Sequence, residues 1–100
     1  MKQKEFDNVV NHRLEKCKEI LGVKGGIYAD KNDRLKNFYD GASFNECTPE
    51  QYAHMLVTKH LVSIKDHIIN NRPMSEAFID EKITDVINYM LLIEALVEAE

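Results

Sequence analysis

The sequence predicts an all-helical bundle of three longer helices and one short helix, forming a single domain over residues 1–100. Apolar residues recur at three- and four-residue steps, and helix-capping residues precede several of these segments. No segment alternates apolar and polar residues for long enough to indicate a strand. With 100 residues, 44% of them apolar, the chain can bury a core without metals or disulfides.

The first predicted helix covers residues 4–21, and polar residues fill the gaps in its apolar stripe. The stripe consists of Phe6, Val9, Val10, Leu14, Cys17, Ile20 and Leu21. Gly22 stands where a helix often ends in a left-handed residue. Three glycines within five positions then predict an irregular connection over residues 22–30.

The second predicted helix is short, and Asp33 is its expected N-cap. Its apolar residues share one face, and Gly41 weakens its end. These apolar residues are Leu35, Phe38, Tyr39 and Ala42.

The third helix has the clearest start, because Thr48-Pro49-Glu50-Gln51 combines a capping hydroxyl, a first-turn proline and a Gln at the third position. We expect it to run from Pro49 to about Asn70, where the residues before Pro73 stop it. Ser75 caps the fourth helix, which reaches nearly to Glu100. Its expected core stripe is Ile79, Ile83, Val86, Met90, Ile93 and Val97.

The third and fourth helices each carry a second stripe that is polar at one end and apolar at the other. On the third helix this stripe is Tyr52, Leu56, Lys59, Ser63 and Asp66. On the fourth helix it is Glu81, Asp85, Asn88, Leu92 and Ala95. Because a short connection makes the two helices antiparallel neighbours, the polar ends meet and the apolar ends meet. The pattern predicts a pocket with an apolar floor and a charged rim.

Two interpretations of the polar ends stay open. Lys59 can pair with Asp85 or Glu81 on a solvated surface, which contributes little energy. Asn88 favours a binding site instead, because it continues the polar stripe into the apolar half, where an amide needs partners. Asp66, Glu81 and Asp85 supply the oxygen ligands that a hard divalent ion prefers, although no Cys/His spacing matches a zinc site.

A second basic group lies upstream at Lys24, Arg34 and Lys36, next to glycine-rich backbone. Lysine, arginine and glycine suit phosphate, while Tyr28 is the better-placed aromatic residue to contact a base. A solvated loop beside core aromatic residues is the alternative. The sequence has no P-loop and no dinucleotide-binding motif.

The net charge, the apolar runs and the cysteines indicate which classes of partner and which compartment to expect. A formal net charge of −4 argues against duplex nucleic acid as the main partner. The longest apolar run, Met90-Leu91-Leu92-Ile93, is far too short to span a membrane. Two cysteines, Cys17 and Cys47, and no basic-plus-apolar leader indicate a reduced, cytoplasmic protein.

Five motifs together resemble a family of short phage and prophage proteins. They are Leu21-Gly22-x-Lys24-Gly25-x-x-Tyr28-Ala29, Asp33-Arg34-Leu35-x-Asn37-Phe38, Thr48-Pro49-Glu50, Lys59-His60-x-x-Ser63-Ile64-x-Asp66 and Glu81-Lys82-Ile83-x-Asp85-x-x-Asn88-Tyr89. The family is grouped under the nucleotide-modification-associated label and is similar to all-helical MazG-type pyrophosphohydrolases. The resemblance covers nearly the whole chain. It implies a MazG-like fold and a phage-encoded protein, in the host cytoplasm, that handles a phosphorylated nucleotide.

The leading hypothesis from this resemblance is a small oligomeric protein that binds or sequesters a phosphorylated nucleotide, such as a host-defence signal. It requires no cofactor and no catalytic residue. The expected nucleotide-binding residues are Lys24, Tyr28, Arg34, Asn37, Lys59, His60, Ser63, Asp66, Glu81, Asp85 and Asn88.

The alternative hypothesis is a MazG-like, Mg²⁺-dependent nucleoside triphosphate pyrophosphohydrolase, with Asp66, Glu81 and Asp85 as metal ligands. The chain departs from the MazG pattern, because Lys59, Ser63 and Asp66 stand where that family has an acidic cluster. A lysine there repels Mg²⁺ and attracts phosphate. A third hypothesis is a protein-interaction module without a small ligand. Leu92 and Leu96 lie away from the expected core stripe, so we also expect self-association through the C-terminal half of the fourth helix, with the ligand site near the subunit boundary.

Overall fold

The computed structural model describes residues 1–28 and 33–100, and within residues 23–28 it describes the backbone alone. The helices are α1 (Gln3–Tyr28), α2 (Lys36–Phe44), α3 (Pro49–Ile69) and α4 (Glu76–Glu98). Among the described residues there is no β-strand, so the all-helical class with three longer helices and one short helix is confirmed. No helix in this part of the chain is long and apolar enough to cross a membrane.

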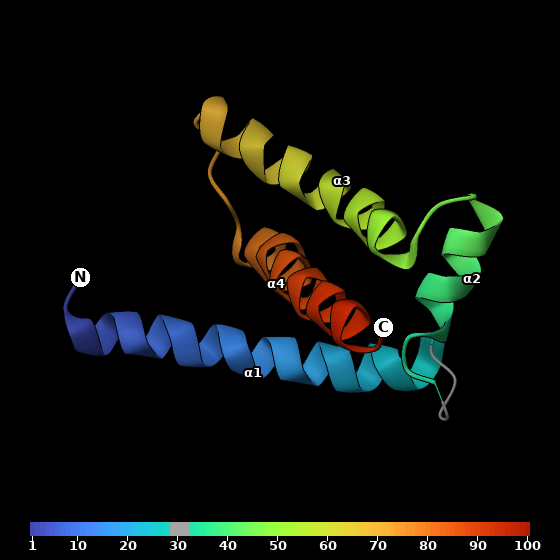
Figure 1. The fold of residues 1–100 in the computed structure, drawn as a ribbon. Helices are drawn as coiled ribbons and strands as arrows, with labels where there is room; N and C mark the ends of the chain where they lie inside the picture. The colour runs from blue at the N-terminus through green and yellow to red at the C-terminus, as the bar shows by residue number, and fades with distance from the viewer. Residues whose placement is uncertain (29–32) are drawn as a thin grey trace.

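α4 is the central helix and lies between α1 and α3, as Figure 1 shows. α3 and α4 are antiparallel neighbours, as their short connection predicts, and α2 packs on α3. α1 runs parallel to α4, because Arg13 contacts Thr84 and, one turn later, Cys17 contacts Asn88. The pocket described below lies where these packed helices meet.

Local hydrogen bonds fix both ends of α3. Thr48 Oγ1 accepts from Gln51 N at 3.1 Å, and Gln51 Oε1 accepts from Thr48 N at 2.9 Å, which completes the predicted capping box. At the other end Asn71 takes a left-handed backbone with φ 53°, and Arg72 N donates to His67 O at 2.8 Å. This Schellman-type ending confirms that the helix stops before Pro73.

The end of α1 differs from the prediction, because the helix continues through Gly22 to Tyr28. The predicted loop is therefore wrong for residues 22–28. Gly22 has no positive φ, and α1 also contains Gly25 and Gly26, each of which costs about 1 kcal/mol relative to alanine. Packing of the preceding turn on α4 outweighs that cost. The side chains of Lys24 and Tyr28, two predicted ligand contacts, lie outside the described residues.

The start of α2 also differs, because Leu35 is the N-cap and its side chain caps nothing. Asp33 instead stabilises the preceding turn, where its Oδ1 accepts from Leu35 N at 3.0 Å. Within α2, a Cβ atom on Gly41 would lie 2.3 Å from ring atoms of Tyr52. Gly41 is therefore the residue that lets α2 approach the ring closely.

The core gathers where α2, α3 and α4 meet. Phe38, Ala53 and Leu96 form its buried cluster, against which Leu92 packs. Leu92 and Leu96, through which the sequence analysis expected self-association, are covered within the chain: Leu96 is fully buried, and Leu92 packs against the cluster. The buried positions of α4 are Thr84, Asn88 and Leu96 rather than the predicted apolar stripe.

Candidate functional site

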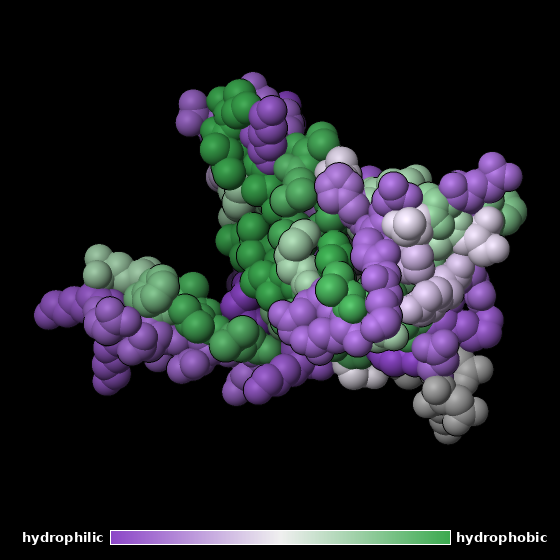
Figure 2. Space-filling view, viewed as in Figure 1, coloured by the Kyte–Doolittle hydropathy of each residue, from purple (hydrophilic) through white to green (hydrophobic). Residues whose placement is uncertain are grey.

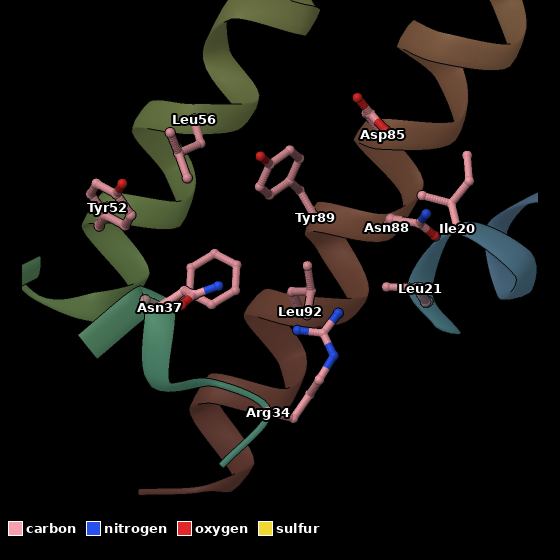
Figure 3. A pocket seen from close by; sticks show the side chains of 11 residues that line it. Ile20, Leu21, Arg34, Asn37, Tyr52, Leu56, Asp85, Asn88, Tyr89 and Leu92 are labelled. Atoms are coloured by element: carbon pink, nitrogen blue, oxygen red, sulfur yellow. The ribbon is translucent and has the colours of Figure 1, made fainter. Parts of the chain in front are cut away.

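A pocket of about 270 Å³ opens between the C-terminal part of α1, the start of α2, and the facing sides of α3 and α4. Figure 3 shows its side chains converging from these four helices and from the turn before α2. The lining residues are Ile20, Leu21, Arg34, Asn37, Phe38, Tyr52, Leu56, Asp85, Asn88, Tyr89 and Leu92. An apolar floor with a few polar groups is the usual composition of a small-molecule site.

Four predicted ligand contacts line this one pocket. Arg34 comes from the turn before α2, Asn37 comes from the start of α2, and Asp85 and Asn88 come from adjacent turns of α4. They lie about 50 residues apart in the sequence, so the tertiary packing brings the two pairs together. The predicted apolar floor is also present, since Tyr52, Leu56 and Leu92 line the same pocket.

Asn88 is the least satisfied polar group in the pocket wall. Its side chain is only 5% exposed, and its Nδ2 donates to Cys17 O at 3.3 Å. Its Oδ1 is buried and has no hydrogen-bond partner among the described residues. An unpaired buried acceptor costs about 1–3 kcal/mol, a cost that a hydrogen-bond donor reaching this carboxamide would remove.

Arg34 supplies the positive charge. Its side chain is exposed, and no carboxylate of the described residues lies within ion-pair distance of it. Figure 3 shows the guanidinium beside Leu92, at the rim of the pocket. A guanidinium in this position can form paired hydrogen bonds with a phosphate or carboxylate of a ligand.

Two tyrosines give the pocket its aromatic character. Tyr52 packs edge-on against Phe38, with ring centroids 6.5 Å apart and an angle of 72° between the planes. Burial raises the pKa of Tyr89, and the nearby Asp85 and Tyr52 raise it further. The Tyr89 phenol therefore stays protonated and can donate a hydrogen bond. The sequence analysis did not single out Tyr89, whose signal is its place directly after Asn88 in the last matched motif.

His60 lies behind the pocket rather than in its wall. Its Nε2 is 3.5 Å from Asp85 Oδ2, and its ring centroid is 5.9 Å from that of Tyr89. Burial lowers the pKa of His60; Asp85 opposes this effect, and Lys82 and Lys59 reinforce it. His60 is thus a neutral support for Asp85 and Tyr89 at neutral pH.

The other predicted contacts on α3 and α4 do not line the pocket. At the end of α3, Asp66 forms an ion pair with Arg72 at 3.0 Å and accepts a hydrogen bond from Asn70 Nδ2 at 2.8 Å. Lys59 is exposed and Glu81 is 64% exposed. Ser63 is half-buried but lines no part of the pocket.

This difference has a geometric cause. The most buried face of α3 carries Ala53, Val57 and His60, one residue along from the predicted stripe, of which Tyr52 and Leu56 alone line the pocket. A shift of one residue turns a helix face by about 100°. His60 therefore pairs with Asp85 where the sequence analysis placed Lys59.

No group of three or more His, Cys, Asp or Glu side chains is placed to hold a metal ion in the described part of the chain. Asp66, Glu81 and Asp85 therefore do not form a common ligand set. Asp85 lines the pocket, whereas Asp66 is engaged at the far end of α3.

Polar contacts between α1 and α4 hold one wall of the pocket in place. Arg13 Nη1 donates to Asp80 Oδ1 at 2.9 Å and to the fully buried Thr84 Oγ1 at 2.7 Å. These contacts set the register of α1, which places Ile20 and Leu21 in the pocket wall. Burial raises the pKa of the Cys17 thiol, so this cysteine is a packing residue rather than a nucleophile.

Comparison of the chain with protein-family models, with curated proteins and with solved structures finds no match.

Proposed function

We propose that the pocket binds a phosphorylated nucleotide and retains it without turning it over. The observation that carries this proposal is the combination, in one pocket, of an arginine, two tyrosines and a buried carboxamide oxygen with no partner. A nucleotide offers the matching groups: a phosphate, a flat aromatic base and several N–H and O–H donors. Few other classes of small metabolite combine all three.

Each part of a nucleotide has a matching group of side chains in the pocket or at its rim. The rings of Tyr52 and Tyr89 and the side chain of Leu56 provide apolar contact area for a base. Asn88 Oδ1 and the Asp85 carboxylate are acceptors for amino, imino or hydroxyl groups. A pocket of about 270 Å³ is slightly below the usual range of about 300–1,000 Å³, so the phosphate would lie outside it, at Arg34.

The sequence resemblance supports the same proposal. The short phage and prophage proteins that the chain resembles are nucleotide-associated, and two of the matched motifs contain Arg34, Asn37, Asp85 and Asn88. A phage protein of this kind would act by sequestering a nucleotide of the host, such as a defence signal, in the host cytoplasm. No cofactor is required for that role.

Hydrolysis is the second candidate function. It rests on the resemblance to MazG-type enzymes, in which clustered carboxylates hold Mg²⁺. Only Asp85 of the three predicted ligands lines the pocket, which favours binding over hydrolysis. Incubation with nucleoside triphosphates and Mg²⁺, followed by assay of released pyrophosphate, distinguishes the two. Release that Asp85→Asn abolishes would establish the enzyme.

The test of binding is calorimetric titration with a nucleotide panel, on the parent protein and on Arg34→Ala. A hydrogen bond to a charged group contributes about 1.5–3 kcal/mol, so Arg34→Ala should weaken binding roughly tenfold or more. Lys65→Ala is the matched control, because it removes an equally exposed positive charge from α3, outside the pocket. Equal affinity of the two variants would contradict the role of Arg34, and no binding of any nucleotide would favour an interaction module.

A further inference from the structure

The chain is unusually open for its size. Its Cα radius of gyration is 15.3 Å, against about 13 Å for a compact chain of 100 residues. Its accessible surface is 7262 Å², about 1,400 Å² more than the roughly 5,800 Å² expected for a monomer of 11.6 kDa. A standard protein–protein interface buries about 800 Å² on each partner, so the surplus is large enough for one.

Large apolar side chains contribute to this exposed surface. The outer stripe of α4, defined as Ile79, Ile83, Val86, Met90 and Val97, contains five of the six residues that the sequence analysis assigned to the core, and the sixth, Ile93, does pack against the buried cluster. Met90 is 45% exposed and Val97 is 56% exposed, while the other three are half-buried. Figure 2 shows the resulting hydrophobic surface in the middle of the molecule, where it extends over α3 and onto α1.

The outer stripe has the geometry of a helix-packing surface. It is about 27 Å long at 1.5 Å per residue, and no charged residue lies on it. A shallow hollow between Ile79 and α1, lined also by Asn8, Val9, His12, Arg13 and Glu76, separates it from the exposed apolar side chains of α1. Those side chains are Phe6, Val9, Val10 and Leu14.

An uncharged stripe of this kind can face a copy of itself. Across a twofold axis every side chain meets the same surface patch, so a charged stripe would bring like charges together, whereas an apolar one does not. Packing of two such helix faces would bury part of the surplus surface on both chains. We therefore infer that a second copy of this chain docks on the outer stripe of α4, forming a twofold-symmetric dimer.

This surface is separate from the nucleotide pocket. The four α4 residues in the pocket and the outer stripe lie roughly 130° apart around the helix. The proposed dimer therefore differs from the one expected from the sequence, in which the ligand site lay near the subunit boundary. Assembly and nucleotide binding should respond to different substitutions, so each proposal can fail without the other.

The test is the mass in solution, from sedimentation or light scattering over micromolar concentrations. The parent protein should have the mass of two chains. Met90→Lys and Val97→Lys should each weaken the dimer by at least roughly tenfold, because a charge then enters the apolar contact. Both positions are exposed in the single chain, so the variants should keep their helical circular dichroism and their calorimetric affinity for nucleotide.

Met55→Lys is the matched control, because Met55 is 52% exposed on the opposite side of α3 from its most buried face. It should leave the dimer intact. A parent protein with the mass of one chain at all concentrations would overturn the inference. So would dissociation by Met55→Lys together with an unchanged dimer in Met90→Lys and Val97→Lys.

Discussion

Replacing Asn88 with leucine should make the unliganded protein more stable while it abolishes ligand binding. Leucine has the same branched arrangement of heavy atoms and removes the buried Oδ1, which has no partner among the described residues. Relief of an unpaired buried acceptor is worth about 1–3 kcal/mol. The substitution also removes the 3.3 Å hydrogen bond to Cys17 O, which contributes about 0.5–1.5 kcal/mol.

The balance is a gain of about 1 kcal/mol, because Cys17 O already accepts a hydrogen bond within α1. In a domain of this size such a gain raises Tm by about 4–8 °C. The assay is thermal and urea unfolding of the two proteins by circular dichroism, together with calorimetric titration with nucleotide. A gain in stability at the cost of function is typical of residues kept for binding.

Thr84→Val is the matched control, since Thr84 is a fully buried polar residue one turn earlier on α4. Its hydroxyl accepts from Arg13 at 2.7 Å, so its loss should destabilise the protein by about 1.5–3 kcal/mol. The two substitutions should therefore have opposite signs. Destabilisation by Asn88→Leu of more than about 1 kcal/mol would refute the reasoning and make Asn88 a structural residue.

The remaining predictions concern the two glycines and His60. Gly22→Ala should stabilise the protein by about 0.5–1 kcal/mol in urea unfolding, because Gly22 lies inside α1 and a new Cβ atom there would have nothing within 4 Å. A loss of stability would instead indicate that α1 ends at Gly22. Gly41→Ala should destabilise it by about 1–3 kcal/mol and weaken nucleotide binding, since the new Cβ atom displaces the Tyr52 ring from the pocket wall. Because the pKa of His60 is lower in the folded than in the unfolded chain, the unfolded chain binds a proton first as the pH falls below about 6.5. Stability should therefore decrease from pH 7.5 to pH 5.5, and His60→Gln should make that decrease smaller; an unchanged slope would show that His60 does not cause it.

Local chemistry made the ends of α3 and the start of α4 predictable from the sequence. The capping residues Thr48 and Ser75 act on backbone groups only three residues away, so their effect is written in the adjacent sequence. Gly22 was misleading because contacts far away in the sequence, rather than its neighbours, decide its conformation. Its intrinsic preference is worth about 1 kcal/mol, and packing of α1 on α4 decides where the helix ends.

The buried face of α4 was not predictable, because its partners lie far away in the sequence. Asn88 and Thr84 are buried where they form hydrogen bonds to α1, about 70 residues earlier in the sequence. The more apolar outer stripe of α4 is less buried. A prediction from hydrophobic periodicity assigns the most apolar face of a helix to the core. In the candidate site, Arg34 and Asn37 of the matched motifs line the pocket, whereas Lys59 does not.

Retention of an intact nucleotide in the pocket is the central claim, and the contents of the purified protein test it most directly. The protein and its Asn88→Leu variant are purified from cells that synthesise signalling nucleotides, denatured, and the released small molecules are identified by mass spectrometry. An intact phosphorylated nucleotide released by the parent protein, and little or none released by the variant, is the predicted result. Equal amounts from both proteins, no nucleotide from the parent, or only a hydrolysed product would contradict the claim.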